Sequence, residues 1–285
     1  MARGTLAHVP IASTAPPRSQ LQGIRGQPFI DLEPHIDTSA FALMHEEICL
    51  ALATLEVAYT GGCHRSMGIM PERFAQEPFA DYGEVIPAMT DAEFLRFASL
   101  GDDTALVDPS NRAQYTFGEE RTIALSNAQM RYLEVRFGVY FPWKTYLELM
   151  PGGRWVDKAN PEGKHFTRTA MVHFPRTVAF VRSLPFAHLG SVKLLGLAAN
   201  DHGTVHRDHE PDASRAPDHF ISFCPKGDKE LFLWDEGTQS KTVAPSRVYW
   251  FNDGDYHGVS KAPFFRYSIR VDGAFTPGFL QTLLG

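Results

Sequence analysis

Two histidines and one aspartate in the last third of the chain have the residue types and the spacing of a metal site. His206 and Asp208 stand two positions apart, and His257 follows later in the run Asp-Tyr-His-Gly-Val. Side chains two apart on a β-strand point to the same face, so a later strand has to bring His257 over them. Two imidazoles and one carboxylate hold a non-haem Fe(II) ion on one side and leave its other positions open. We therefore predict that these three residues bind Fe(II).

A second copy of the same tripeptide shows that the pattern is weak evidence by itself. His35 and Asp37 also stand two apart, but they lie at the predicted start of a helix, where an aspartate caps the first turn. We expect no metal there. His209 follows the first copy directly and would point away from Asp208 on a continuing strand, so it is only a substitute ligand. The alternative for His206 is an ordinary surface strand followed by a turn.

A strand after the distal histidine carries a positively charged face. Within residues 264–272, Arg266, Ser268 and Arg270 share one face of the strand. If this face is buried it needs an anionic partner, because an unpaired buried guanidinium costs several kcal/mol. The planar fork of Arg266 matches a carboxylate, and Ser268 can donate a further hydrogen bond. The alternative is a solvated face on an edge strand.

Arg270 has a different predicted role from Arg266. It stands four residues, or about 13 Å, further along an extended strand, which is too far to bind the same carboxylate well. We therefore expect Arg270 either to contact an acidic substrate or to stabilise the fold.

The three predicted ligands and Arg266 resemble the 2-oxoglutarate/Fe(II)-dependent dioxygenase superfamily, over residues 190–273. The run Trp-Phe-Asn-Asp before the distal histidine, with the later pairs Phe-Arg and Val-Asp, is similar to the aspartyl/asparaginyl β-hydroxylase and cis-proline hydroxylase branch. The spacing Arg266-x-Ser268 is similar to the isopenicillin N synthase-like branch. The two branches agree on Arg266 and differ in substrate class.

The resemblance implies a cofactor, two co-substrates and a reaction. Fe(II) would bind 2-oxoglutarate and O2, with the distal carboxylate of 2-oxoglutarate on Arg266 and Ser268. Oxidative decarboxylation would release succinate and CO2 and leave a ferryl species that hydroxylates an amino acid, a peptidyl residue or a small metabolite. Desaturation and ring formation stay open. Three aromatic residues would then be apolar walls that exclude water from the site, or ordinary core residues: Trp234, Trp250 and Phe251.

The segments that position these residues change in character near Leu189. After it, short stretches rich in valine, isoleucine and aromatic residues alternate with turn residues, which predicts β-strands. The predicted strands are residues 192–199, 203–208, 219–224, 229–235, 239–243, 247–252, 256–260 and 264–272. Eight strands are the number that a jelly roll requires. The predicted fold class is α+β, with a double-stranded β-helix (jelly roll, cupin-like) core at 189–285.

Residues 31–188, before this core, are predicted to be mainly helical and to pack against one of its sheets. Apolar residues at helical spacing predict a first helix at 37–58, with Asp37 or Thr38 as its N-cap. Two capping boxes and one amphipathic stretch mark later helices: Thr90–Glu93, Ser126–Gln129 and residues 167–183. Residues 1–30 have arginines but no acid, a weak transit-peptide pattern that several prolines interrupt. We expect a flexible tail there.

Composition and charge argue against several classes of function. The 285 residues are 44% hydrophobic, enough to bury the core of one compact catalytic unit. The 27 basic and 33 acidic residues are interspersed and give a net charge of −6, which disfavours a nucleic-acid partner. No apolar run approaches the roughly 20 residues needed to cross a bilayer, so we expect no membrane partner. Cys49, Cys63 and Cys224 form no CxxC pair and suit the reducing cytoplasm.

Two rival functions keep the same fold. A cupin-like metalloenzyme without 2-oxoglutarate would usually have more histidines on neighbouring strands, so Asp208 and the Arg266 face disfavour it. A non-catalytic jelly-roll binding module would use Arg266 and Arg270 to hold an anionic ligand without iron. Measuring bound iron tests the binding-module alternative. The oligomeric state cannot be predicted from these patterns.

Overall fold

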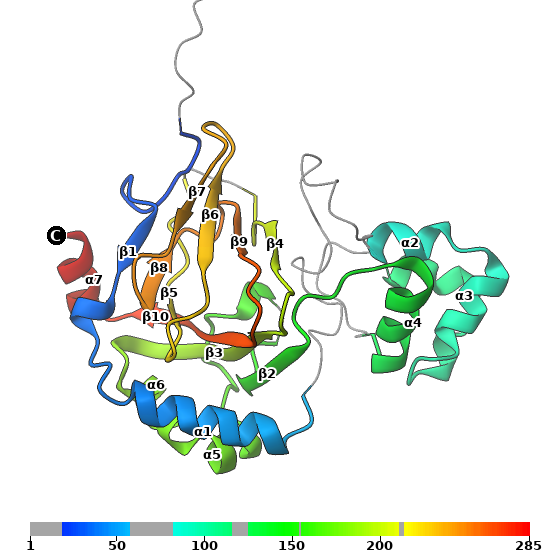
Figure 1. Ribbon diagram of the computed structural model, residues 1–285, viewed down its shortest axis with the longest axis horizontal. Coiled ribbons are helices and arrows are strands. Elements are labelled where there is room, and N and C mark those ends of the chain that lie inside the picture. The colour runs from blue at the N-terminus through cyan, green and yellow to red at the C-terminus, as the bar shows by residue number, and fades with distance from the viewer. Residues whose placement is uncertain (1–18, 58–81, 116–124, 154, 211–213) are drawn as a thin grey trace, which may run out of the picture.

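The computed structural model describes residues 19–57, 82–115, 125–153, 155–210 and 214–285. Cys63 and residues 1–18 of the predicted tail lie outside these ranges. The described residues form helices and two antiparallel sheets (Figure 1). No helix among them is both long and apolar enough to cross a membrane.

The larger sheet has six strands in the order β1-β8-β5-β10-β3-β2, and the smaller has four in the order β4-β9-β6-β7. Their bounds are β1 (Phe29–Asp31), β2 (Thr145–Met150), β3 (Phe186–Leu197), β4 (Gly203–His206), β5 (Phe220–Phe223), β6 (Leu231–Asp235), β7 (Ser240–Val243), β8 (Val248–Phe251), β9 (His257–Val259) and β10 (Arg266–Phe275). Each of the eight predicted strands has its counterpart among β3 to β10, although β3 begins at Phe186, six residues before its predicted start. Nearly all of β10 is buried, because packing covers both faces of the strand.

Two strands come from regions where none was predicted. Phe29–Asp31 pairs with β8, and Thr145–Met150 pairs with β3. The first is too short for a sequence pattern, and the second shows no alternation of buried and exposed residues, so neither could be recognised by periodicity. The structure therefore extends the larger sheet at both edges with segments that precede residue 189.

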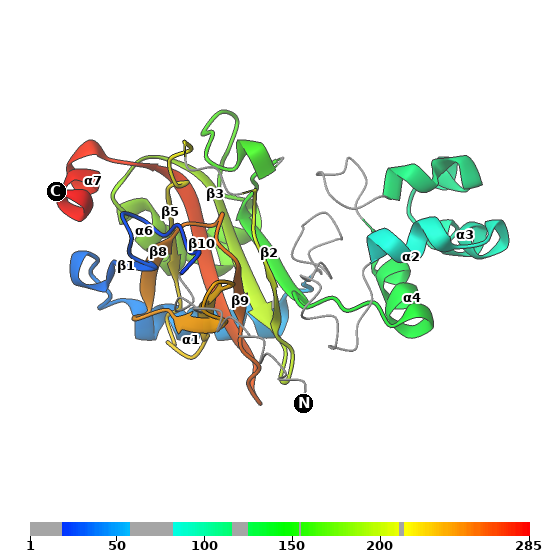
Figure 2. The same cartoon turned by 90° about the horizontal axis from the view of Figure 1, so that it is seen from above.

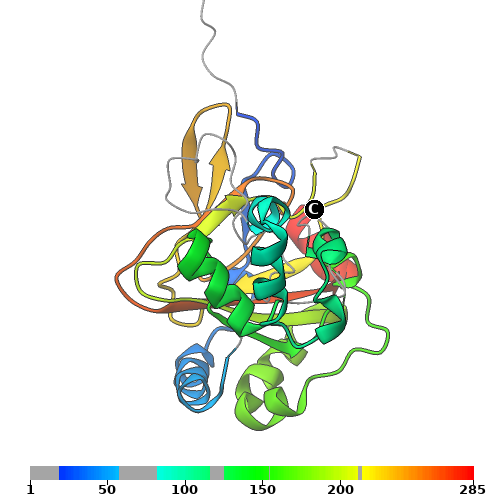
Figure 3. The same ribbon diagram turned by 90° about the vertical axis from the view of Figure 1, so that its right-hand side faces the viewer.

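Helices cover the outer face of the larger sheet. In Figures 1 and 3, α1 (Phe41–Thr54) lies beneath the sheet beside α5 (Arg168–His173) and α6 (Pro175–Ser183). The helix predicted at 37–58 is present, but its N-cap is Ala40. Asp37 accepts a hydrogen bond from the Ser39 N–H at 2.9 Å instead, so neither Asp37 nor Thr38 caps the helix.

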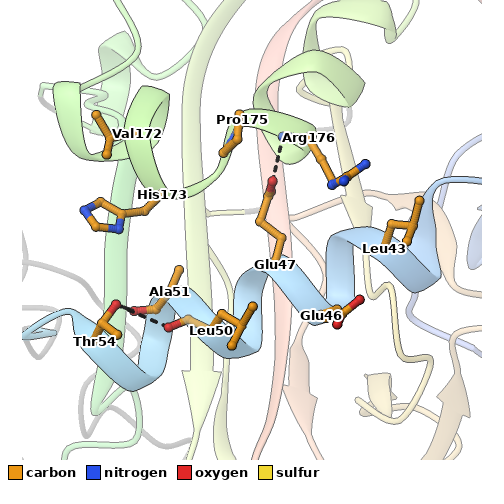
Figure 4. Close-up of a pocket in the computed structure, with 10 residues that line it drawn as sticks. All are labelled: Leu43, Glu46, Glu47, Leu50, Ala51, Thr54, Val172, His173, Pro175 and Arg176. Carbon is orange, nitrogen blue, oxygen red and sulfur yellow. Dashed lines mark hydrogen bonds between the residues drawn. The ribbon is translucent and has the colours of Figure 1, made fainter.

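The amphipathic stretch predicted at 167–183 is divided into α5 and α6. Pro175 has no N–H to donate, and it stands at the first position of α6, where a helix needs none. Glu47 of α1 then caps α6: its carboxylate accepts from the backbone N–H groups of Arg176 (2.7 Å) and Thr177 (2.9 Å). Figure 4 shows this contact in a pocket of about 530 Å³ between α1 and the α5–α6 segment.

One helix, α7 (Pro277–Leu284), lies beside β1, and on the opposite side of the molecule further helices form a separate lobe beside the sheets (Figures 1 and 2). It comprises α2 (Tyr82–Ala88), α3 (Asp91–Ala98) and α4 (Asn127–Phe137), with the short 3-10 helices η3 (Thr104–Leu106) and η4 (Pro109–Tyr115). Both predicted capping boxes are confirmed, with Thr90 before α3 and Ser126 before α4. The other 3-10 helices are η1 (Glu33–His35) and η5 (Trp155–Asp157).

The two faces of β10 have different surroundings. Tyr267 points to the helices, where its hydroxyl lies 2.9 Å from Nδ1 of His45 on α1. Arg266, Ser268 and Arg270 alternate with it and point to the other face, toward the smaller sheet. The charged face predicted from the sequence is thus buried between the sheets, which removes the alternative of a solvated edge strand.

Candidate metal centre

The three predicted ligands meet where β4 and β9 pair. His206 ends β4 and faces His257 at the start of β9, with 4.3 Å between their ring centroids. Asp208 follows β4 directly. Its Oδ1 lies 3.5 Å from Nε2 of His206 and 3.8 Å from Nε2 of His257. The ligand atoms all lie within 4.8 Å of one another, so a single ion could contact all three.

Hydrogen bonds to the backbone orient both imidazoles. Nδ1 of His206 lies 2.7 Å from the carbonyl oxygen of Thr204, and Nδ1 of His257 lies 3.0 Å from that of Asp255. A carbonyl only accepts, so each neutral ring must carry its proton on Nδ1 and keep a lone pair on Nε2. The same arrangement holds metal-binding histidines in other proteins. The donor set therefore fits a divalent ion.

The protonation states also suit a metal. Burial lowers the pKa of His257 to about 4, and the neighbouring His206 acts in the same direction. Burial disfavours a charge on Asp208, but its contacts with His206, His257 and Arg270 keep its pKa well below the usual range. Metal ligands must be deprotonated, and His257 and Asp208 meet that requirement at neutral pH.

A strap made of residues 20–24 secures this corner from the N-terminal side. The carboxylate of Asp255 accepts from the backbone N–H groups of Gln22 and Gly23, both at 2.8 Å. The carbonyl of the same aspartate orients His257. The strap, Asp255 and the distal ligand therefore form one connected chain of hydrogen bonds.

Arg270 lies directly behind Asp208. Its guanidinium contacts three carboxylates: Asp208 Oδ2 (2.9 Å), Asp253 Oδ2 (2.6 Å) and Asp272 Oδ1 (2.9 Å). Lys158 also contacts Asp253, at 2.8 Å, so the cations at this corner are already paired with carboxylates of the chain. Because Nε, Nη1 and Nη2 of Arg270 each have such a partner, this geometry favours a positioning role for Arg270.

Arg266 is fully buried at the other end of the same strand face. Its Nη1 donates to the backbone oxygens of Ala198 (3.2 Å) and Phe264 (3.4 Å), and its Nη2 to those of Asp201 (2.5 Å) and Ser260 (2.6 Å). These acceptors are neutral. They join β10 to the loops that follow β3 and β9, so in this structure Arg266 acts as a clamp between loops.

Ser268 lies between the two arginines and is contacted by a lysine that sequence reasoning missed. Nζ of Lys229 lies 2.5 Å from Oγ of Ser268, 3.4 Å from the oxygen of Leu195 and 4.6 Å from the ring centroid of Trp143. Within the described ranges no carboxylate lies at ion-pair distance from Lys229, and burial lowers its pKa to about 7. The turn-like run Lys-Gly-Asp-Lys gives no sign of this, because only pairing between distant strands buries the lysine.

A second group of potential ligands holds cations instead. His209, Asp218 and Asp253 also offer atoms within 4.8 Å of one another. Lys158, however, contacts both carboxylates, at 2.8 Å for Asp253 and 3.0 Å for Asp218. Arg270 adds a second positive charge, so we assign no metal to this group. His209, the predicted substitute ligand, lies here and not beside the other three ligands.

Three further histidines pack against aromatic rings. His35 of the second tripeptide stacks edge-on against Phe279, at 6.4 Å between ring centroids. His202 stacks on Tyr140 (4.9 Å) and His219 on Phe275 (4.7 Å). None of them joins a metal-ligand cluster among the described residues.

Of the three aromatic residues predicted as apolar walls of the site, one contacts a predicted metal ligand. Phe251 packs edge-on against the ring of His257, with 5.0 Å between ring centroids. Trp250 is a core residue whose indole N–H donates to the oxygen of Asp218 at 2.8 Å. Trp234 is only partly buried on β6.

Comparisons with known proteins give likeness to solved structures alone. No protein-family model matches the chain, and no curated protein matches it. An oxidoreductase of the 2OG-Fe(II) oxygenase family from Burkholderia pseudomallei is 12% identical over 46% of this chain and 70% of its own, with a TM-score of 0.29. A viral collagen prolyl hydroxylase from Paramecium Bursaria Chlorella virus-1, in complex with 2OG, is 10% identical over 45% and 76% (TM-score 0.25). A prolyl-4-hydroxylase from Pseudomonas putida is 12% identical over 46% and 71% (TM-score 0.26).

With TM-scores this low, the functional argument depends on the residues of the site.

Proposed function

We propose that this protein is an Fe(II)- and 2-oxoglutarate-dependent oxygenase whose metal is held by His206, Asp208 and His257. One observation carries the proposal. Both imidazoles keep Nδ1 on a backbone carbonyl and direct Nε2 toward the same carboxylate oxygen, Oδ1 of Asp208. Two neutral imidazoles and one carboxylate, open on the other side, are the donor set of non-haem Fe(II) oxygenases.

The arrangement of the strands supports a jelly-roll core for this site. β3, β5, β8 and β10 belong to the larger sheet, and β4, β6, β7 and β9 to the smaller one. The chain thus alternates between the sheets, with one hairpin of neighbours at β6 and β7, as in a double-stranded β-helix. The metal ligands lie at the paired ends of β4 and β9, facing the interior.

The distal carboxylate of 2-oxoglutarate is proposed to bind at Ser268 and Lys229. Ser268 is the next inward-facing residue of β10 after Arg270, about 7 Å along the strand. Lys229 lies against it, buried and without a carboxylate at ion-pair distance among the described residues. Arg266, the partner expected from the sequence, stands at the start of β10, further from Arg270 than Ser268 does, and already donates to backbone oxygens, so we assign it a supporting role.

Iron and 2-oxoglutarate, when bound, would supply the activation of dioxygen for oxidation of a C–H bond. The chain's own residues hold His257 and Asp208 deprotonated, fix both imidazoles, and keep water from one side of His257 through Phe251. The proposed substrate is an amino acid, a peptidyl residue or a small metabolite, and hydroxylation is the proposed outcome.

The test is an anaerobic titration of the metal-free protein with Fe(II), followed by 2-oxoglutarate. We expect one Fe(II) per chain and, on adding 2-oxoglutarate, the weak visible charge-transfer band of a chelated keto acid. Admitting O2 should then release succinate. Iron binding without the band or succinate would favour a cupin-like metalloenzyme. Absence of iron binding would leave the jelly-roll binding module as the better account.

A further inference from the structure

The two carboxylate oxygens of Asp208 have different partners. Oδ1 faces the Nε2 atoms of His206 and His257, whereas Oδ2 accepts a hydrogen bond from Nη1 of Arg270 at 2.9 Å. A carboxylate can offer one or both oxygens to a metal. With Oδ2 held by a guanidinium, only Oδ1 is directed at the proposed metal position.

We propose that Arg270 is a positioning residue that makes Asp208 a ligand through one oxygen alone. This inference rests on the proposed metal site. A second oxygen on the metal would occupy a position that a bidentate keto acid and dioxygen need. Arg270 would therefore control how many coordination positions of the metal stay free for the co-substrates, although it does not contact the metal itself.

The guanidinium can do this because its other nitrogens are fixed. Nε donates to Asp272 at 2.9 Å and Nη2 to Asp253 at 2.6 Å, and the guanidinium carbon lies 3.8 Å from the ring centroid of Phe220. Asp272 is itself held by the hydroxyl of Ser191 at 2.8 Å. A planar fork with three fixed contacts leaves the direction of Nη1 little freedom.

Asp253 connects the arginine to the backbone of the ligand. Its carbonyl oxygen accepts from the N–H of Asp208 at 2.8 Å, and its Oδ2 contacts both Arg270 and Lys158. The carboxylate of Asp253 is fully buried. Asp208 is thus positioned twice from the same residue, once through the backbone and once through Arg270.

The experiment compares Arg270→Lys with Arg266→Lys, using Co(II) alone as the probe of the metal-free protein. Both variants make the same exchange on the same face of β10, but only Arg270 touches a metal ligand. A lysine keeps the charge and loses the fork. We expect Arg270→Lys to weaken Co(II) binding about 10- to 100-fold, as loss of a group behind a ligand does, and Arg266→Lys to change it less than about threefold.

The visible Co(II) spectrum separates positioning from general destabilisation. In Arg270→Lys the d–d bands should shift in position and intensity, since Asp208 can then turn or offer both oxygens. A variant that is merely less stable would lower the melting temperature and leave the spectrum of the bound metal unchanged. Wild-type affinity together with a wild-type spectrum in Arg270→Lys would overturn the proposal.

A crystal structure of the wild-type protein with Co(II) tests the same inference without any variant. Asp208 should contact the metal through one oxygen while the other stays within hydrogen-bond distance of Arg270. A carboxylate bound through both oxygens, or turned away from Arg270, would contradict the inference even if Arg270→Lys fails to fold. If the wild-type protein binds no Co(II), the proposed metal site itself is wrong. That result differs from the two results that test Arg270, which are Asp208 bound through one oxygen and Asp208 bound through both.

Discussion

The two ends of the inward face of β10 place like charges in opposite surroundings. At the metal end, Arg270 contacts three carboxylates, one of which also contacts Lys158. Toward the other end, Arg266 donates to backbone oxygens, and Lys229 contacts the Ser268 hydroxyl and lies over the ring of Trp143. An anion from solution gains little at the first end, where the cations are already paired with carboxylates. It gains most at the second, where no carboxylate of the described residues lies at ion-pair distance from the buried Lys229.

The pKa values report the same difference. Burial alone would lower the pKa of Arg270, but the carboxylates of Asp272, Asp253 and Asp208 raise it. Lys229 has no such compensation, and burial lowers its pKa to about 7. A buried lysine whose proton is so weakly held indicates a position where an anionic ligand would restore the charge. The comparison therefore separates groups that build the site from groups that receive a ligand.

The largest expected effect is at the metal end. His257→Ala or His206→Ala should abolish the 2-oxoglutarate charge-transfer band, because loss of a ligand removes both affinity and geometry. The band is measured anaerobically with Fe(II) and 2-oxoglutarate in excess. His35→Ala, in the second tripeptide, should leave the band at wild-type intensity. A persistent band in His257→Ala would show that the ligand set is wrong.

At the end with Arg266 and Ser268, Lys229→Met should raise the half-saturating 2-oxoglutarate concentration about 10- to 100-fold. The reason is the loss of a charge-assisted contact worth about 1.5–3 kcal/mol. Fe(II) affinity should stay the same, because Lys229 is not a ligand. Succinate release against 2-oxoglutarate concentration measures the first quantity. An unchanged half-saturating 2-oxoglutarate concentration would indicate that Arg266, and not Lys229, binds the distal carboxylate.

The same lysine predicts a pH dependence. Below pH 7 Lys229 is charged and ready to bind a carboxylate. Above it the ligand-free lysine is neutral and binding must take up a proton, so 2-oxoglutarate affinity should fall by up to about tenfold per pH unit. Calorimetric titration of the Co(II)-loaded protein with 2-oxoglutarate checks this, with the affinity followed over about two pH units, from about pH 6.5 to about pH 8.5. In Lys229→Met the slope should be lost, and a wild-type slope in that variant would assign the proton to another group.

The smallest effect on 2-oxoglutarate is expected from Arg266→Met. Because its acceptors are backbone oxygens, the half-saturating concentration should change less than about threefold, while the free energy of unfolding drops by about 3 kcal/mol through unpaired buried carbonyls. Denaturant unfolding measures the second quantity. A change in 2-oxoglutarate affinity larger than that in Lys229→Met would reverse the comparison between these two cations.

Local patterns predicted much of this arrangement. The residue types of His206, Asp208 and His257 already define a set of metal donors. Side chains two positions apart on a strand share a face, so His206 and Asp208 are expected to lie together and a later strand to bring His257 to them. The strands from β3 onward have alternating or continuous apolar residues between turn signals, which gives their existence though not their exact ends. The capping boxes at Thr90 and Ser126 are equally local.

What could not be predicted depends on contacts between distant segments. The partners of Arg270 and Arg266 depend on which loops reach the strand, and the spacing along the strand, which separates the two arginines, does not identify those loops. Lys229 and Lys158 stand in polar runs typical of turns, and only the packing of the sheets buries them. Sequence reasoning could also not place Asp253 behind the ligand, because its role depends on a backbone contact with Asp208.

The strap at residues 20–24 gives the distal ligand a connection to the beginning of the chain. When the strap opens locally, the N–H groups of Gln22 and Gly23 leave the carboxylate of Asp255, the residue whose carbonyl orients His257. The rate of amide hydrogen exchange at these two positions thus measures how often this corner of the site loosens. A metal ion that binds only the ordered corner would slow that exchange, so protons on a segment remote in sequence become a reporter of the metal's occupancy.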